Sequence, residues 1–203
     1  MKLRNCIFII VIILISNIYV MSQEFDNETI TLGSGCFWCS EAIFQRLDGV
    51  SQVESGYCGG DIINPTYDQV CTGKTSHAEV VRVTYKPNVI GLSELLEVFF
   101  KTHDPTTLNR QGADVGTQYR SVIFYNSDEQ KKVALDIIKE LNAKQIWDKP
   151  IVTQVVQMST FYPAEKYHQN YFNDNKNQGY CRFVIVPKLE KFEKVFSDKF
   201  KKN

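Results

Sequence analysis

The 203-residue sequence predicts a single α+β domain, and three observations lead to this prediction. The length suits one globular domain. The composition, with 43% hydrophobic and 23% charged residues, is typical of a folded chain. Apolar patterns with strand and helix periods follow one another in the order strand, helix, strand, strand, helix, strand. That order suits a ferredoxin-like split βαβ core with additional helices and long loops.

The core elements follow from periodicity and from the residues that end them. In chain order we expect a strand at 29–32, a helix at 36–47, strands at 50–57 and 79–85, a helix at 92–102 and a strand at 119–125. Gly49 is a natural stop for the first helix, and Pro87 ends the third strand. Residues 60–77 and 103–118 have no periodic pattern, so we expect long irregular loops, which in compact domains are usually functional or disordered.

The remaining elements are additions to this core. They are a helix at 127–143, a strand at 151–157, a helix at 163–172 and a Lys-rich helix at 189–200. Ser127, with Gln130 three residues later, is typical of a capping box at the start of the first addition. The stretch 173–178 is polar and rich in asparagine.

The N-terminus has the composition of a targeting segment. Lys2 and Arg4 precede a run without charged or polar side chains at 6–15, and the apolar character continues to Met21. A basic, then apolar, then small and polar order is typical of a secretory signal peptide. We expect residues 1–22 to be removed, with an uncleaved membrane anchor as the alternative. Residues 23–203 would then be the working domain, exported to the periplasm or the extracellular space.

Charge and cysteine counts limit the function. The 23 basic and 23 acidic residues cancel, and loss of Lys2 and Arg4 leaves 21 basic against 23 acidic residues. Such a chain has no basic footprint for a nucleic-acid backbone. The leader also removes Cys6, after which five cysteines remain: Cys36, Cys39, Cys58, Cys71 and Cys181. An odd number in an exported chain favours a reactive thiol or an intermolecular bridge.

Cys36 directly follows a Gly-Ser-Gly turn and opens the first predicted helix. Free backbone N–H groups and the helix dipole stabilise an anion there, so we expect a lowered thiol pKa and a nucleophile. Phe37 and Trp38 would form an apolar wall beside the sulfur. Cys36 and Cys39 together form a C-x-x-C motif, which fits a redox pair, a nucleophile with a local resolving thiol, or half of a zinc site. Zinc is disfavoured because no second C-x-x-C or C-x-x-H follows.

Three further side chains offer an acid and two hydrogen-bond donors. Glu79 opens a β-branched strand, and partial burial would keep its carboxyl protonated, which suits a general acid. A solvated carboxylate at a sheet edge is the alternative. Tyr67 and Tyr119 lie in or beside irregular segments, where each phenol could donate a hydrogen bond or pack half-buried.

Together these segments resemble the peptide methionine sulfoxide reductase A family. The matching motifs run in family order across nearly all of residues 29–187, and they are Gly35-Cys36-Phe37-Trp38, Ser55-Gly56-Tyr57-x-Gly59-Gly60, Asn64-Pro65-Thr66-Tyr67, Val70-Cys71-Thr72-Gly73, His77-Ala78-Glu79, His103-Asp104-Pro105, Asp114-x-Gly116-Thr117-Gln118-Tyr119-Arg120-Ser121 and Tyr162-Pro163-Ala164-Glu165-x-x-His168-Gln169. Several are long and specific, so agreement by chance is excluded in practice. The signal-like segment is not covered by the resemblance.

The resemblance implies a reaction for these residues. Cys36 would attack the sulfur of a methionine S-sulfoxide, free or within a protein, and become a sulfenic acid. Glu79 would protonate the sulfoxide oxygen, with hydrogen bonds from Tyr67 and Tyr119. The substrate methyl group would lie against Phe37 and Trp38, and Asp114 would shape the polar side of the site.

The resemblance also implies a second thiol that turns the sulfenic acid into a disulfide. Cys181, in Gly179-Tyr180-Cys181, matches the family's resolving position and lies in a polar stretch that we expect to be mobile. Cys39 is the second candidate, while Cys58 and Cys71 are expected to be structural or accessory. A thioredoxin-like donor would reduce the disulfide. We expect no metal or organic cofactor, no nucleic acid, no membrane contact beyond the leader, and a monomer.

Two other functions remain open at this point. A general thiol–disulfide oxidoreductase that uses Cys36 and Cys39 would reduce disulfides without forming methionine. An exported non-catalytic module would have its cysteines paired with one another or bound to metal.

Overall fold

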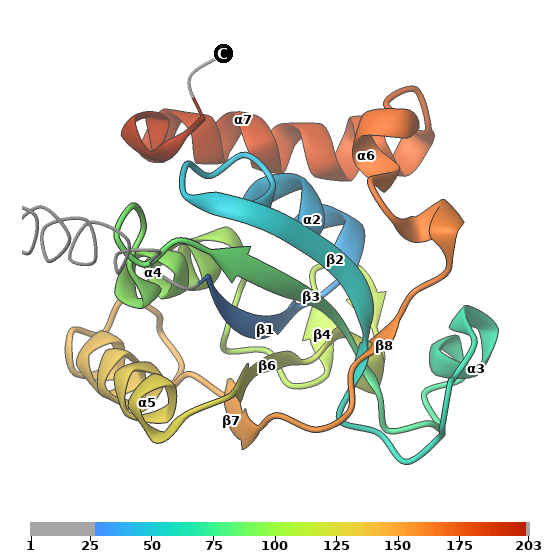
Figure 1. Ribbon diagram of the computed structural model, residues 1–203, viewed down its shortest axis with the longest axis horizontal. Coiled ribbons are helices and arrows are strands. Elements are labelled where there is room, and N and C mark those ends of the chain that lie inside the picture. Colours follow the sequence, from blue (N-terminus) through green and yellow to red (C-terminus); the bar gives the residue numbers. More distant parts are fainter. Residues whose placement is uncertain (1–26, 202–203) are drawn as a thin grey trace, which may run out of the picture.

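A mixed six-stranded sheet forms the centre of the computed structural model, which describes residues 27–201 (Figure 1). The elements are, in chain order, β1 (Glu28–Ser34), α2 (Phe37–Phe44), β2 (Val50–Cys58), α3 (Tyr67–Cys71), β3 (Ala78–Tyr85), α4 (Leu92–Thr102), β4 (Arg110–Gln111), β5 (Asp114–Val115), β6 (Ser121–Tyr125), α5 (Asp128–Ala143), β7 (Gln154–Gln157), β8 (Tyr162–Pro163), α6 (Tyr171–Asp174) and α7 (Val186–Val195). The predicted leader, residues 1–22, lies outside the described residues.

The strand order of the sheet is β7-β6-β1-β3-β2-β8. Helix α2 joins β1 to β2, and β3 lies between those two strands. Helix α4 joins β3 to β6, and β1 lies between them in the same way. These four strands pair antiparallel, which is the split βαβ arrangement, so the predicted α+β core is confirmed. The two edges are extended by β7, parallel to β6, and by β8, antiparallel to β2.

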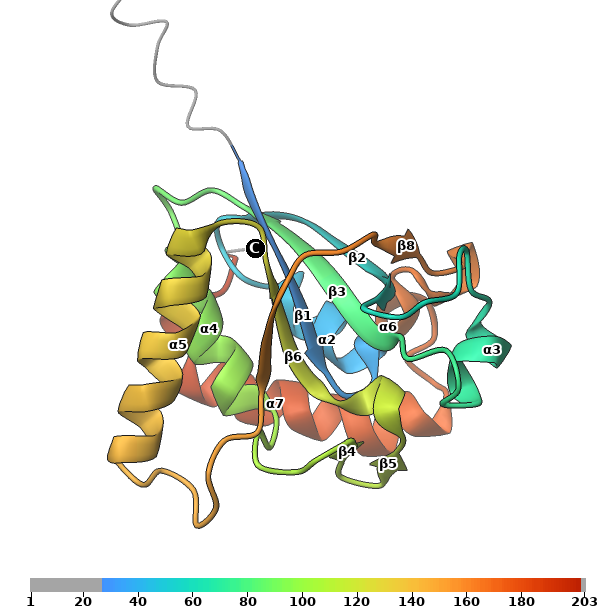
Figure 2. The same cartoon turned by 90° about the horizontal axis from the view of Figure 1, so that it is seen from below.

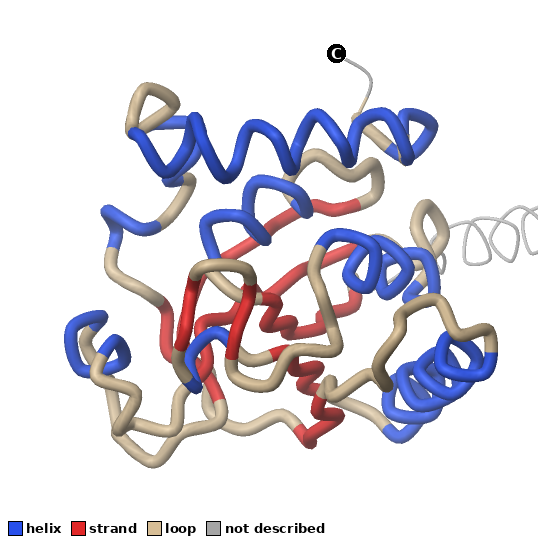
Figure 3. The backbone as a smooth tube through the Cα atoms, turned by 180° about the vertical axis from the view of Figure 1, so that it is seen from behind, coloured by secondary structure: helices blue, strands red, loops and turns tan. Residues whose placement is uncertain are grey.

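The main core lies between one face of the sheet and the helices. Successive side chains of a strand point to opposite faces, so Val81 and Val83 of β3 join the cluster that contains Phe99 of α4. Val80 belongs instead to a smaller cluster, with Phe124, on the opposite face. Helix α7 packs along α2, which lies between α7 and the sheet (Figure 3). Helix α5 packs beside α4 at one end of the molecule (Figure 2).

Two predicted segments are corrected by the structure. Residues 163–172 are not one helix, because β8 pairs with β2, a 3-10 turn follows at Lys166–His168, and Asn170 has a left-handed φ of 54° before α6. The last helix begins earlier than predicted. A π-helical segment at Cys181–Ile185 runs directly into α7, which ends at Val195.

The long loops contain short elements that periodicity did not reveal. Within 60–77, α3 is started by a capping box in which the Thr66 hydroxyl accepts from the Gln69 N–H and the Gln69 side chain accepts from the Thr66 N–H. Within 103–118, β4 and β5 form a hairpin before a 3-10 turn at Thr117–Tyr119.

The capping prediction for α5 is half correct. Ser127 is the N-cap, and its hydroxyl accepts from the Gln130 N–H at 3.2 Å. The Gln130 side chain, however, accepts from the Asn126 N–H at 2.9 Å rather than from Ser127. In the part of the chain that the structure describes, no helix combines the length and the apolar character needed to cross a bilayer.

Candidate active site

Cys36 lies at the junction where β1 ends and α2 begins. It is the N-cap of α2, and 9% of its surface is exposed. The turn before it depends on Gly35, which has a φ of 91° and whose absent Cβ would lie 2.6 Å from the Gln111 side chain. Only glycine fits both requirements. The structure therefore places the thiol at a helix start, as the sequence predicts, in a buried position.

The ionisation of Cys36 differs from the prediction. Burial raises the pKa of its thiol well above the ordinary value, and a hydrogen bond with Cys39 and the nearby Glu79 carboxyl act in the same direction. The expected lowering at a helix start is therefore wrong for the substrate-free protein, because loss of solvation outweighs the helix dipole. The hydrogen bond has the opposite effect on its partner and lowers the pKa of Cys39 to about 7.

Glu79 is a buried acid at the start of β3. Only 2% of its surface is exposed, and the Phe37 N–H donates to its Oε2 at 3.1 Å. Burial raises the pKa of the carboxyl to about 8, against the lowering effect of that hydrogen bond. Glu79 is therefore protonated at neutral pH, as the sequence predicts, and it can donate a proton.

Two phenols lie close to this acid. Tyr67 begins α3, and Tyr119 ends the 3-10 turn that precedes β6. Burial raises the pKa of both, and the charge of Glu79 adds to the effect on each, so both remain neutral hydrogen-bond donors. The charges of Cys36 and Asp114 raise the pKa of Tyr119 further. The structure thus gathers the predicted acid, both predicted donors and Asp114 around the nucleophile.

An aromatic wall borders the site and consists of Phe37, Trp38, His168 and Tyr171. The Trp38 and Tyr171 rings stack, with centroids 3.7 Å apart and planes 7° apart. The Trp38 indole N–H donates to His168 Nδ1 at 3.2 Å. The His168 ring in turn lies 5.2 Å from the Phe37 ring. The two aromatic residues predicted from the sequence are present, while His168 and Tyr171 had no predicted role.

Glu165 is another functional candidate that the sequence did not single out. Its carboxylate accepts from the Tyr57 hydroxyl at 2.8 Å and from the backbone N–H of Tyr67 at 2.9 Å. It therefore fixes the start of α3, which carries one of the two phenols. Glu165 and His168 lie in the last motif of the resemblance, which gave them no role.

The two candidate resolving cysteines differ in their surroundings. Cys39 lies three residues after Cys36, and its backbone N–H donates to the Cys36 carbonyl oxygen at 3.1 Å. The Cys39 Sγ lies 4.0 Å from the Tyr180 hydroxyl, which also donates to Asp114 Oδ2 at 2.8 Å. Cys181 is not in a mobile polar stretch, because it opens the helical segment before α7 and has 0% exposure. Burial raises its pKa, and the nearby charge of Cys39 adds to this effect.

The other two cysteines have different surroundings. Cys58 belongs to the cluster on the opposite face of the sheet, and its Sγ lies 3.4 Å from Ser159 Oγ. Cys71 is exposed at the end of α3, beside Tyr67. None of the five cysteines in residues 27–201 forms a disulfide. Within the same range, no three His, Cys, Asp or Glu side chains are grouped so that they could hold a metal ion.

Comparison with known sequences finds close relatives. The family profile for peptide methionine sulfoxide reductase matches residues 28–200. The peptide methionine sulfoxide reductase MsrA of Trichodesmium erythraeum is 56% identical over 171 residues, which cover 84% of this chain and 97% of that protein. MsrA of Sulfolobus acidocaldarius is 55% identical over 172 residues, which cover 85% and 97%.

Solved structures agree with these sequences. Mxr1 of Saccharomyces cerevisiae in its reduced form has a TM-score of 0.70 and 38% identity, with 78% of this chain and 92% of that chain covered. Methionine sulfoxide reductase A of Corynebacterium diphtheriae has a TM-score of 0.68 and 34% identity, with 77% and 78% covered. The yeast protein in complex with Trx2 has a TM-score of 0.50 and 30% identity, with 74% and 90% covered. This chain, in which a buried acid lies beside an N-cap cysteine, belongs to the MsrA family of peptide methionine sulfoxide reductases.

Proposed function

We propose that this protein reduces methionine S-sulfoxide, free or within proteins, to methionine. The observation that carries the proposal is the Glu79 carboxyl, which is buried, has a pKa of about 8 and lies beside the cysteine that caps α2. A sulfoxide oxygen is a poor leaving group until it is protonated, and an acid that is still protonated at neutral pH supplies that proton.

In the first step, Cys36 is the nucleophile and Glu79 is the general acid. Cys36 passes its proton to the Cys39 thiolate, and its sulfur attacks the sulfoxide sulfur. Glu79 protonates the oxygen, which then transfers as a hydroxyl group to the Cys36 sulfur. The substrate sulfur gains two electrons and leaves as methionine. Cys36 loses two electrons and becomes a sulfenic acid.

The surrounding residues orient the substrate. Tyr67 and Tyr119 donate hydrogen bonds to the sulfoxide oxygen, since both phenols stay neutral. Phe37 and Trp38 hold the methyl group on the apolar side, and Asp114 shapes the polar side. Because the methyl group and the oxygen require opposite sides of the site, one sulfoxide epimer is preferred.

A second thiol then resolves the sulfenic acid. We favour Cys39 over Cys181 for this step, because Cys39 lies three residues after Cys36 and its backbone N–H donates to the Cys36 carbonyl oxygen at 3.1 Å, whereas Cys181 opens the separate helical segment before α7. The Cys39 sulfur bonds to the Cys36 sulfur, and the hydroxyl group leaves as water with the thiol proton. A dithiol of the thioredoxin class then reduces the disulfide and becomes oxidised itself. The yeast relative in complex with Trx2 supports a partner of this class.

Disulfide mapping tests the resolving step. Reaction with one equivalent of methionine sulfoxide without reductant is expected to give a bond between Cys36 and Cys39, detected by mass spectrometry after alkylation. The Cys181→Ser variant should give the same bond, because the two sulfurs that form it remain in place. A wild-type product that links Cys36 to Cys181 and leaves Cys39 alkylated would contradict the assignment.

We base the proposed localisation on the sequence of residues 1–22. Their basic and apolar order supports export of the enzyme to the periplasm or the exterior, or a membrane anchor if the leader stays attached. N-terminal sequencing of the exported protein distinguishes the two outcomes, and a chain that stays in the cytoplasm contradicts both.

A further inference from the structure

Glu41 is a buried carboxylate that the proposed reaction does not use. It lies on α2, two residues after Cys39, and only 1% of its surface is exposed. Burying a carboxylate is unfavourable unless hydrogen bonds compensate for the lost water. Burial accordingly raises the pKa of Glu41, while hydrogen bonds from the backbone of Asn170 and Tyr171 oppose the shift. An apolar side chain would fill this position on α2 without that penalty, so the carboxylate calls for an explanation.

Both oxygens of Glu41 bind the same short stretch of chain. Oε1 accepts from the Asn170 N–H at 2.8 Å, and Oε2 accepts from the Tyr171 N–H at 3.1 Å. Asn170 has a left-handed φ of 54°, so the chain turns sharply at this point. The two bonds fix the backbone on both sides of the turn to α2, the helix that Cys36 caps.

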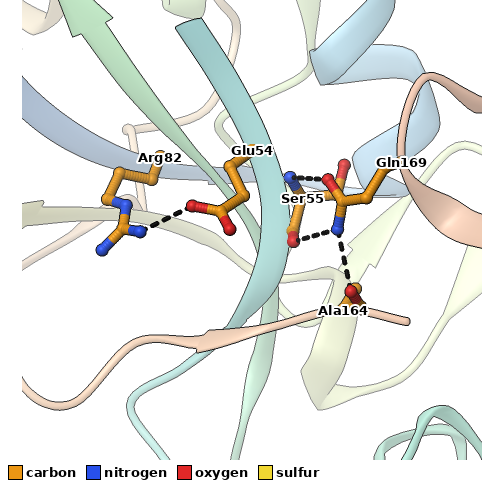
Figure 4. Close-up of polar contacts among 5 residues, drawn as sticks. All are labelled: Glu54, Ser55, Arg82, Ala164 and Gln169. Carbon is orange, nitrogen blue, oxygen red and sulfur yellow. Dashed lines mark hydrogen bonds and ion pairs between the residues drawn. The ribbon is translucent and has the colours of Figure 1, made fainter. Parts of the chain in front are cut away.

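Gln169 fixes the preceding part of this stretch to the sheet (Figure 4). Its side-chain oxygen accepts from the Ser55 N–H at 3.0 Å. Its side-chain nitrogen donates to the carbonyl oxygens of Ser55 and Ala164, at 2.9 Å each. Residues 169–171 are therefore attached to β2 on one side and to α2 on the other.

The ring that this attachment positions belongs to the aromatic wall. Tyr171 stacks on Trp38, which is three residues before Glu41 and therefore on the same face of α2. The same indole donates to His168, which lies on the other side of Gln169 in the chain. One carboxylate is thus bonded to the backbone that carries Tyr171, one of the rings that border the proposed methyl-binding site.

We propose that Glu41 is a positioning residue that holds Tyr171 against Trp38 and thereby sets the affinity of the site for the substrate methyl group. This inference rests on the proposed function, since it assigns Trp38 to that methyl group. Glu41 contacts no reacting atom, so its loss acts on substrate binding and leaves the chemical step in place.

The Glu41→Gln variant tests the inference in a Trp147→Phe background, in which Trp38 is the sole tryptophan. The amide keeps one acceptor oxygen but presents an NH2 group to the second backbone N–H. We expect KM for methionine sulfoxide to rise about 10-fold with kcat within about twofold, as for loss of one hydrogen bond to a charged group. Trp38 emission should shift to the red and be quenched more strongly by acrylamide, because the stacked ring no longer covers it.

Glu94→Gln in the same background is the matched control. Glu94 also accepts from a backbone N–H at a helix start, that of Gly91 at 3.0 Å, and it lies outside the active site on α4. This variant should lower stability without changing KM or the emission of Trp38. Glu41→Asp keeps the charge but has a shorter side chain, so it should change KM and the emission of Trp38 by an intermediate amount. It replaces the Gln variant if that variant does not fold.

Two readouts keep the inference separate from the proposed function. If the wild-type protein forms no methionine, the proposed function fails, and the emission of Trp38 still decides whether Glu41 holds the stack. Unchanged emission and unchanged KM in a folded Glu41 variant would overturn the inference. It would be overturned equally if the Glu41 and Glu94 variants differed only in stability.

Discussion

Replacing Glu79 with Gln is expected to lower kcat about 100- to 1,000-fold, as loss of a positioned general acid does. The amide cannot give a proton to the sulfoxide oxygen. Its Oε1 can still accept from the Phe37 N–H, which donates to Glu79 at 3.1 Å, so the site keeps its shape. The rate of the wild-type enzyme should fall as pH rises through about 8, where Glu79 loses its proton. The residual rate of the variant should lack this decline.

The same substitution should stabilise the folded protein at alkaline pH. The pKa of Glu79 is raised from 4.5 to about 8, so between these values the folded state holds a proton that the unfolded chain has lost. The wild-type protein therefore loses stability as pH rises through this window. A tenfold change in proton affinity corresponds to about 1.4 kcal/mol, so the shift from 4.5 to about 8 costs on the order of 5 kcal/mol at pH 9, which removal of the carboxyl should recover.

Urea unfolding of both proteins at pH 5, 7 and 9 measures this effect. The gain should be small at pH 5 and largest at pH 9. Tyr67→Phe and Tyr119→Phe are the controls, since each removes one neutral donor and should lower kcat about 10-fold while keeping the pH slope of stability. If the free energy of unfolding changes with pH in the same way in the wild-type protein and in the Glu79→Gln variant, the fold does not hold Glu79 protonated.

The sequence predicted best where a single local rule decides the structure. Helix α4 spans Leu92–Thr102 as predicted, because its apolar stripe repeats with the helical period. The segment 163–172 was predicted wrongly, because its apolar spacing reflects contacts with β2 and α2 rather than a helix. The bonds that decide this come from Ser55 and Glu41, more than 100 residues earlier in the chain. No local pattern contains that information.

The chemistry of the site shows the same division. The sequence placed Cys36 at a helix start and Glu79 at a strand start correctly, and partial burial of an acid between apolar neighbours could be predicted. The pKa of Cys36 could not, because burial by distant segments opposes the local dipole. For Cys181 a signal was available. Cys181, Ile185 and Leu189 are four residues apart and all buried, which is a helical stripe that joins Cys181 to the predicted helix at 189–200, although we expected Cys181 itself to lie in a mobile stretch.

Cys36→Ser is expected to reduce methionine release to the background, a loss of at least about 1,000-fold, because a serine hydroxyl is not appreciably ionised near neutral pH and is a far weaker nucleophile than a thiolate. Cys39→Ser is the matched control, since it removes the neighbouring thiol and keeps the nucleophile. Without reductant, the wild-type protein and the Cys39 variant should each release one equivalent of methionine, and the Cys36 variant should release none.

A second substitution at Cys36 tests whether its thiol lowers the pKa of Cys39. The interaction with Cys36 is the main cause of the low pKa of Cys39, so Cys36→Ala, which removes the donor altogether, should move the alkylation of Cys39 by iodoacetamide to higher pH. Alkylation of Cys39 with an unchanged pH midpoint would show that the charge on Cys39 does not depend on Cys36. Retained methionine release would remove Cys36 as the nucleophile altogether. Loss of methionine release would identify Cys36 as the nucleophile. A shifted midpoint would show that the Cys36 thiol stabilises the thiolate form of Cys39, which accepts the proton of Cys36 in the proposed first step.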